Sequence, residues 1–139
     1  MTLREAFQAF HGNNVALFEQ REPLADARKF FAHHDMAHVV FGCDTSLVGE
    51  GKVKLWTLFG TNLGIWGHLR GYSEASAFAL FKQYSLKHVV SNVFLVVKCA
   101  PMVIYRAATM SNKWPWSEYE QYLDLPLDQV RREFNIRCL

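Results

Sequence analysis

The sequence predicts an all-α protein that forms a single multi-helix domain over residues 1–139. Two observations favour this fold class: apolar residues recur at helical spacing along most of the chain, and no segment shows sustained alternation of apolar and polar residues. A third observation indicates a single domain: no repeat, low-complexity run or internal boundary divides the chain. With 139 residues, half of them hydrophobic, the chain is long enough to bury a core.

The first part of the chain contains two clear helical patterns. The apolar positions of the first share one face of a short helix: Leu3, Ala6, Phe7 and Phe10. Val15–Gln20 is expected to add another turn or two. A long helix then covers about 24–41, with Pro23 suited to its first turn and Gly42 to its end. Its buried positions are predicted to be Leu24, Ala27, Phe31, Met36, Val39 and Val40.

The next helix is predicted over about 47–59, with inward residues Leu47, Val48, Leu55, Trp56 and Phe59. Candidates for its N-cap are Asp44, Thr45 and Ser46. The short connection predicts an antiparallel helix hairpin that brings Glu50, in the first or second turn, back toward the preceding helix. Gly49 and Gly51 flank Glu50 and lower helix propensity by about 1 kcal/mol each, so we expect close packing there.

The middle of the chain is less regular. The glycine-rich segment 60–67 matches no phosphate-binding loop, and we interpret it as a close-packed turn or the mouth of a cavity. Ser73 is expected to cap a helix that extends to about Tyr84. A buried helix over about 86–100 follows, with Val89–Val97 the one place where a strand could form.

The C-terminal third is predicted to be mostly helical. Pro101 is expected to interrupt the preceding helix, which resumes over about 102–110. A loop over 113–116 leads to a short helix capped by Ser117, and Pro126 opens a last helix over 127–134.

Composition excludes several classes of function. The formal charge of +2, with no run of Lys or Arg, argues against nucleic acid as a partner. Three widely spaced cysteines indicate a reducing compartment rather than a disulfide framework. The N-terminus lacks the pattern of a signal peptide, and the apolar run Val89–Met102 is too short to cross a bilayer. We expect a soluble cytoplasmic protein, at most peripheral on a membrane.

The residues that carry chemistry lie near the helix hairpin. On a helix, His34 and His38 stand one turn apart on one face, flanked by Asp35, and Glu50 comes from the following segment. Two imidazoles and two carboxylates form a ligand set acceptable to Zn(II), Fe(II) or Mn(II). In the simpler alternative, these histidines face solvent and Asp35 merely pairs with His38; His33 is a bystander.

Parts of this pattern also occur in two other families of metal enzymes. Asp35 stands where the zincin motif needs Glu as its general base, which weakens that interpretation. The adjacent His34 and Asp35 also resemble the pair of HD phosphohydrolases, which need a separate upstream His and a downstream Asp. His11 and Asp124 are the candidates for those two positions.

The complete pattern is more specific. The motif H-D-x-x-H followed after eleven residues by E, at 34–50, resembles the signature of the coenzyme Q biosynthesis protein 4 family. The resemblance continues through 39–42, 47–50 and 53–56 and includes the closing segment 126–136. Because 33 residues precede the motif, the chain is similar to a short form of that family.

The resemblance implies a role in ubiquinone biosynthesis: metal-dependent decarboxylation and hydroxylation at C1 of a polyprenylated hydroxybenzoate, the work of a carboxy-lyase. It also implies an alternative, a non-catalytic protein that binds polyprenyl lipid and organises the other ubiquinone-biosynthesis enzymes. The motif positions carry over to His34, Asp35, His38 and Glu50 as metal ligands. Zinc is the metal the resemblance favours, with iron, manganese and magnesium as alternatives.

The expected partners are a polyprenyl lipid or prenylated aromatic acid, the other biosynthesis proteins and the inner-membrane surface. A homodimer would also cover apolar surface. The residues that could line a tunnel for the prenyl tail, or simply fill the core, are Phe59, Leu63, Ile65, Trp66, Phe78, Phe81, Phe94 and Val97. Trp114 and Trp116 are expected to pack locally rather than at a membrane interface.

Overall fold

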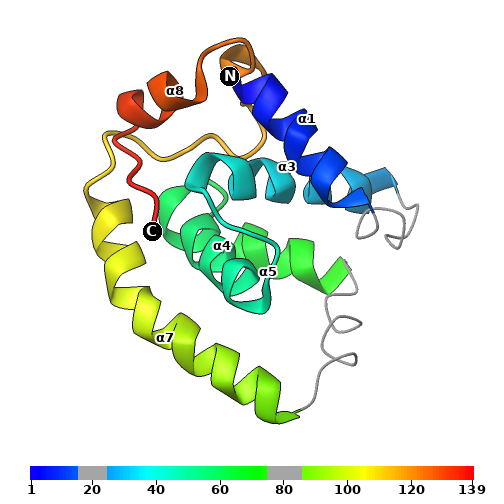
Figure 1. Cartoon of the computed structure of the whole chain (residues 1–139), viewed down its shortest axis with the longest axis vertical. Helices are drawn as coiled ribbons and strands as arrows, with labels where there is room; N and C mark the ends of the chain where they lie inside the picture. Colours follow the sequence, from blue (N-terminus) through cyan, green and yellow to red (C-terminus); the bar gives the residue numbers. More distant parts are fainter. Residues whose placement is uncertain (16–24, 75–85) are drawn as a thin grey trace.

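A computed structural model of the protein describes residues 1–15, 25–74 and 86–139. These residues form six α-helices and one 3-10 helix, with isolated β-bridges and no strand among them. The predicted all-α class is confirmed. Figure 1 shows α4 in the interior of the arrangement, and α4 contacts α3, α5 and α7.

The N-terminal helix α1, Leu3–Asn13, begins with a capping box. The Thr2 side chain accepts from the Glu5 amide, and the Glu5 carboxylate accepts from the Thr2 amide at 2.8 Å. Leu3 and Ala6 are buried, as their spacing predicts, and α1 contacts both α3 and α8. The turn expected after Val15 lies outside the described residues.

The predicted long helix is α3, Ala25–Phe41, and it ends at Gly42 as expected. Gly42 adopts the left-handed conformation, with φ of 65°, which glycine reaches without the steric cost of a Cβ atom. The Arg131 guanidinium from α8 donates to the carbonyls of Val39 and Val40 at 2.8 and 2.9 Å. The expected helix start at Pro23 lies outside the described residues.

Helix α4, Leu47–Gly60, begins after Ser46, whose side chain caps it. Trp56 is fully buried and stacks on Phe41 with ring centroids 4.6 Å apart and planes 9° apart. This pair joins α4 to α3 at the centre of the core. The prediction that Phe59 points inward is wrong, because 37% of its surface is exposed.

The glycine-rich segment contains a turn followed by helix α5, Gly64–Glu74. Gly64 adopts a left-handed φ of 70° at the start of this helix. Ser73 lies inside α5, so the prediction that it begins a new helix is wrong. The remainder of that predicted helix, including Phe78 and Phe81, lies outside the described residues.

Helix α7, Leu86–Ala108, differs from its prediction in two ways. It continues through Pro101 instead of breaking there, and it is a 23-residue helix without a strand. It is also not a buried helix. Val103 and Ala107 pack inward, but large apolar side chains remain exposed: Val93, Phe94, Leu95, Val97, Met102, Ile104 and Tyr105.

The length of α7 also changes the expectation for membranes. The window Ser91–Ala108 has a mean hydropathy of 1.2, and only 11% of it is buried. By length and composition alone this stretch suffices to cross a bilayer, which is weak grounds for a membrane span. The apolar stretch of this helix thus continues beyond the predicted run, to Ala108, and a soluble or a peripheral protein remains compatible with this single helix.

The C-terminal segment closes the core over α1 and α3. Trp114 is 1% exposed and packs against Phe134 at a centroid distance of 5.2 Å, and Trp116 packs against Phe30, so local packing of both tryptophans is confirmed. A 3-10 helix spans Glu120–Tyr122, which starts later than a helix capped by Ser117 would. Helix α8, Leu127–Glu133, follows Pro126 as predicted.

Candidate metal centre

Two histidines of α3 form the centre of the site. His34 and His38 are one helical turn apart, and their imidazole rings meet edge to face with centroids 4.8 Å apart. Only 4% of the His34 surface and 1% of the His38 surface is exposed. The i, i+4 spacing in the sequence therefore places both rings on the buried face of α3.

Glu50 reaches these histidines from the first turn of α4. Its Oε1 lies 3.2 Å from His38 Nε2, and its Oε2 lies 3.6 Å from His34 Nε2. Helix α3 ends at Gly42, and α4 begins after its cap residue Ser46. The short connection between them makes this approach possible. The predicted helix hairpin thus brings Glu50 to the two histidines.

The second nitrogen of each ring also faces an oxygen atom. His38 Nδ1 lies 3.2 Å from the Cys43 carbonyl oxygen, which can accept a hydrogen bond from a protonated Nδ1. This tautomer leaves the lone pair on His38 Nε2, a buried atom with no hydrogen bond of standard geometry in the described structure. His34 Nδ1 lies 3.8 Å from Asp35 Oδ1. Both rings therefore present Nε2 to Glu50.

The electrostatics favour the protonation states that bind a cation. Burial lowers the pKa of His34, so its imidazole stays neutral. Burial acts to raise the pKa of Glu50, but its interactions with His38, His34 and Lys54 outweigh that effect, and the net pKa is lowered. A neutral imidazole and an ionised carboxylate are the forms that ligate divalent metals.

One ligand atom from each of His34, His38 and Glu50 lies within 4.8 Å of the other two, so this group could hold a metal ion. Two imidazole nitrogens and a carboxylate oxygen match the three-ligand sets that leave a position for substrate. Asp35 is not in this group: it is 1% exposed, and its Oδ2 lies 3.3 Å from His11 Nε2. Its role as a direct ligand stays a prediction.

A comparison with known families assigns the chain. The family model described as coenzyme Q (ubiquinone) biosynthesis protein Coq4 matches residues 8–139, nearly the whole chain. The chain belongs to this family. Membership implies involvement in coenzyme Q biosynthesis, together with the other proteins of that process. Comparisons with the curated proteins and with the solved structures find no match.

The two partner positions considered for an HD phosphohydrolase separate in this Coq4 chain. His11 lies beside Asp35, in contact with the site. Asp124 lies at the surface, where its side chain is 81% exposed and pairs with Arg4 at 2.9 Å. The HD ligand model therefore fails at Asp124, and His11 needs another explanation.

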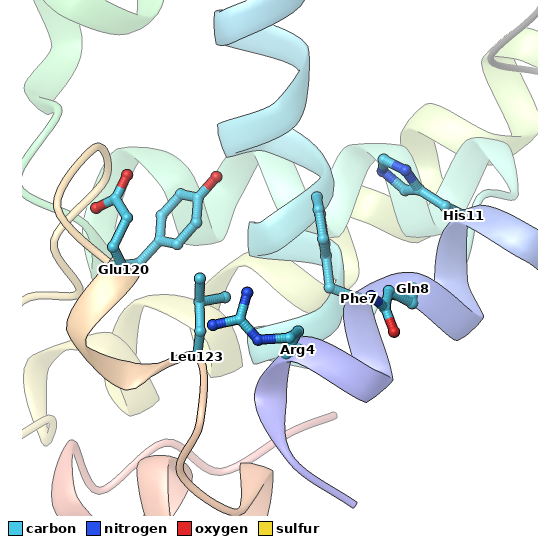
Figure 2. A pocket seen from close by; sticks show the side chains of 7 residues that line it. Arg4, Phe7, Gln8, His11, Glu120 and Leu123 are labelled. Carbon is cyan, nitrogen blue, oxygen red and sulfur yellow. The ribbon is translucent and has the colours of Figure 1, made fainter.

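A pocket of about 540 Å³ opens beside His11, between α1 and the segment 119–123 (Figure 2). It is lined by Arg4, Phe7, Gln8, His11, Tyr119, Glu120 and Leu123. Burial raises the pKa of Tyr119, and the charges of Glu120 and Asp35 add to that effect, so its hydroxyl stays protonated and can donate a hydrogen bond. The pocket therefore reaches His11, whose ring in turn contacts Asp35 of the motif.

Two basic side chains near the site were not found from the sequence. Burial, together with the charges of Lys54 and His34, lowers the pKa of His68 to about 4. Burial also lowers the pKa of Lys54, although Glu50 opposes that shift. Lys54 could have been found, because it lies one turn after Glu50 on α4. His68 comes from α5, and no local pattern places it near His34.

Proposed function

We propose that this Coq4 protein is a metal-dependent enzyme that removes the C1 carboxyl group of a polyprenylated hydroxybenzoate and hydroxylates the same carbon. The observation that supports this proposal is the buried group of His34, His38 and Glu50 in a chain of the Coq4 family. The motif spacing alone would also allow a surface pair of histidines. Their burial against a carboxylate is the arrangement expected of a ligand set.

The chain's own residues would hold the reacting centre in a fixed geometry. His34 and His38 would bind through Nε2, the atoms that face Glu50, and their buried positions would exclude water from two sides. A bound divalent cation supplies positive charge that stabilises the substrate carboxylate and the charge developing as CO2 leaves. Zinc follows from the family resemblance, whereas an oxidative step favours iron or manganese.

The proposed reaction needs an oxidant. The bond from the ring carbon to the carboxyl carbon breaks and a bond to a hydroxyl oxygen forms. Dioxygen would supply that oxygen, with two protons and two electrons from a reductant reducing the other oxygen atom to water. Such an enzyme would be a carboxy-lyase that acts oxidatively, and its substrate would come from a membrane because of the prenyl tail.

The alternative function is a non-catalytic lipid-binding protein that organises other ubiquinone-biosynthesis enzymes, and the outer surface of α7 favours it. Phe94, Val97 and Tyr105 are 59%, 61% and 63% exposed on this one helix. An exposed apolar surface of this kind marks a protein or membrane contact. We propose the inner-membrane surface and its prenyl lipids as the partner, with the protein otherwise in the cytoplasm; a homodimer is the competing occupant.

Metal analysis tests the ligand set. Protein purified without chelator should contain one equivalent of a divalent metal per chain, and His38→Ala should lose it. His33→Ala is the matched control, because it removes an imidazole from the same helix at a residue that packs against Trp116 and Tyr119. Metal-free wild-type protein, or full occupancy in His38→Ala, would refute the ligand set.

Turnover separates the two functions. Metal-loaded protein with a prenylated hydroxybenzoate, dioxygen and a reductant should release CO2 and form the C1-hydroxylated product. Prenyl lipid that copurifies with the protein, combined with no product under these conditions, would support the organising role and refute the enzyme.

A further inference from the structure

The candidate metal centre is covered unequally on its different sides. Among the described residues, the His34 and His38 side chains are 5% and 1% exposed, whereas the Glu50 side chain is 24% exposed. Glu50 lies in the first turn of α4, so α4 supplies the part of the centre that reaches the surface. This exposed carboxylate marks a side from which a substrate can approach the metal.

Lys54 follows Glu50 on the same face of α4. The two residues are four positions apart within the helix, so their side chains leave it one turn apart on one side. Lys54 is half-buried, and burial lowers the pKa of its ammonium group, although the charge of Glu50 opposes that shift. A partly desolvated ammonium group gains more from an anionic partner than one in open water, because its surroundings screen charge less.

His68 shows that Lys54 also lies on the side of His34. Helix α5, which carries His68, packs against both α3 and α4, and His68 is 8% exposed. Burial, and then the charges of Lys54 and His34, lower the pKa of His68 to about 4. An imidazole that feels both side chains lies near both. This ring is neutral at pH 7, so Lys54 rather than His68 supplies positive charge there.

We propose that Lys54 is a specificity-determining residue: its ammonium group pairs with the carboxylate of an aromatic acid at the metal centre and selects the acid over neutral aromatic molecules. The inference rests on the proposed decarboxylation, and it names the group that recognises the carboxyl group to be lost. Lysine suits this task, because its ammonium group is a compact charge on a flexible stem with three rotatable donors.

Charge balance supports a lysine at this position. As metal ligands, Asp35 and Glu50 would each contribute a negative charge, and together they would balance a divalent cation. A substrate carboxylate then adds a negative charge in a partly buried site, where an unpaired charge is costly. Lys54 supplies the matching positive charge. It is not needed to neutralise Glu50, whose two oxygens face His38 and His34 at 3.2 and 3.6 Å.

Binding of an acid and of its neutral ester tests the proposal. The probes are a geranyl-substituted hydroxybenzoate and its methyl ester, titrated by calorimetry into metal-loaded protein. The wild type should bind the acid more tightly than the ester. Lys54→Met should weaken binding of the acid by about 10–100-fold, the usual worth of a hydrogen bond between charged groups, and leave the ester unaffected. Lys54→Arg retains the charge and should keep most of the preference.

Lys52→Met is the matched control. Lys52 lies on the same helix, but its charge acts on Cys43 and Asp44 rather than on Glu50, so this variant should keep the wild-type preference. If Lys54→Met does not fold, Lys54→Gln takes its place with the same expected outcome.

Three results would overturn the proposal: a wild type without preference for the acid, a charge-removing variant that keeps the preference, or one that binds acid and ester equally less well. Loss of bound metal in that variant would also overturn it, because Lys54 would then support the ligands instead of the substrate. Wild-type protein that binds no divalent metal would instead refute the proposed function.

Discussion

Gly49 offers a direct test of the packing that holds Glu50 against the histidines. A Cβ atom added at Gly49 would lie 2.1 Å from the Asp44 carbonyl oxygen and 2.1 Å from Asp44 Oδ1. Neither oxygen can easily move, because Asp44 Oδ1 accepts from the Ser46 amide at 3.0 Å and Ser46 caps α4. Gly49→Ala must therefore displace the loop that starts the helix.

The expected cost follows from three contributions. Overpacking costs about 1–3 kcal/mol, and disturbing the Ser46 cap costs about 1 kcal/mol. The better helix propensity of alanine returns about 1 kcal/mol. Gly49→Ala should therefore lower the free energy of unfolding by about 1–3 kcal/mol.

Gly12→Ala is the matched control for this substitution. Gly12 also lies within a helix, but an added Cβ would meet nothing within 4 Å. The substitution should therefore raise the free energy of unfolding by about 0.5–1 kcal/mol through helix propensity alone. Urea denaturation of metal-free protein, followed by circular dichroism, measures both changes. A Gly49→Ala variant as stable as Gly12→Ala would refute the close contact with Asp44.

Two further predictions follow from pKa shifts. His68 has a pKa of about 4 in the folded protein against about 6.5 when unfolded, so the unfolded state binds more protons between these values. The free energy of unfolding should therefore fall as pH drops from about 6.5 to about 4, by at most about 3 kcal/mol from this residue. In His68→Gln, the urea midpoint should depend less on pH over this range. Equal pH profiles for the variant and the wild type would contradict the shift. Burial raises the pKa of Cys43 from 9.0 to about 12. Its alkylation by iodoacetamide at pH 8 should therefore be slower in native than in unfolded protein by about 1,000-fold or more. Mass spectrometry measures the two rates, and comparable rates would contradict the burial of Cys43.

Much of the helix hairpin could be predicted because its determinants are local. The stop at Gly42 needs a left-handed residue and the start after Ser46 needs a side-chain acceptor, and both requirements are written in the residue types. Once those two ends are fixed, the short connection turns α4 back along α3 and brings Glu50 near His34. The pairing of Asp35 with His11 could not be predicted this way, since it depends on how α1 packs on α3.

Helix α7 shows where local patterns fail. Its apolar composition predicts burial, because covering apolar side chains is favourable. Composition does not say whether the rest of the protein covers them, and here only part of the helix is covered. Val103 and Ala107 face the core, while Phe94 and Val97 remain 59% and 61% exposed. Pro101 misled the prediction for a related reason: proline disfavours a helix interior by about 3 kcal/mol, but the packing of a long helix can outweigh that local cost.

Glu50 is positioned by contacts on both sides of it. A Cβ at Gly49 would meet Asp44 at 2.1 Å, and one at Gly51 would meet Val96 Cγ2 of α7 at 2.2 Å. Each glycine therefore allows a closer approach than any larger residue could, one to the loop before α4 and the other to α7. Because these two contacts flank Glu50, they fix the position of α4 relative to the loop before it and relative to α7. The motif supplies the proposed ligands, but the two glycines determine whether the carboxylate can reach the histidines.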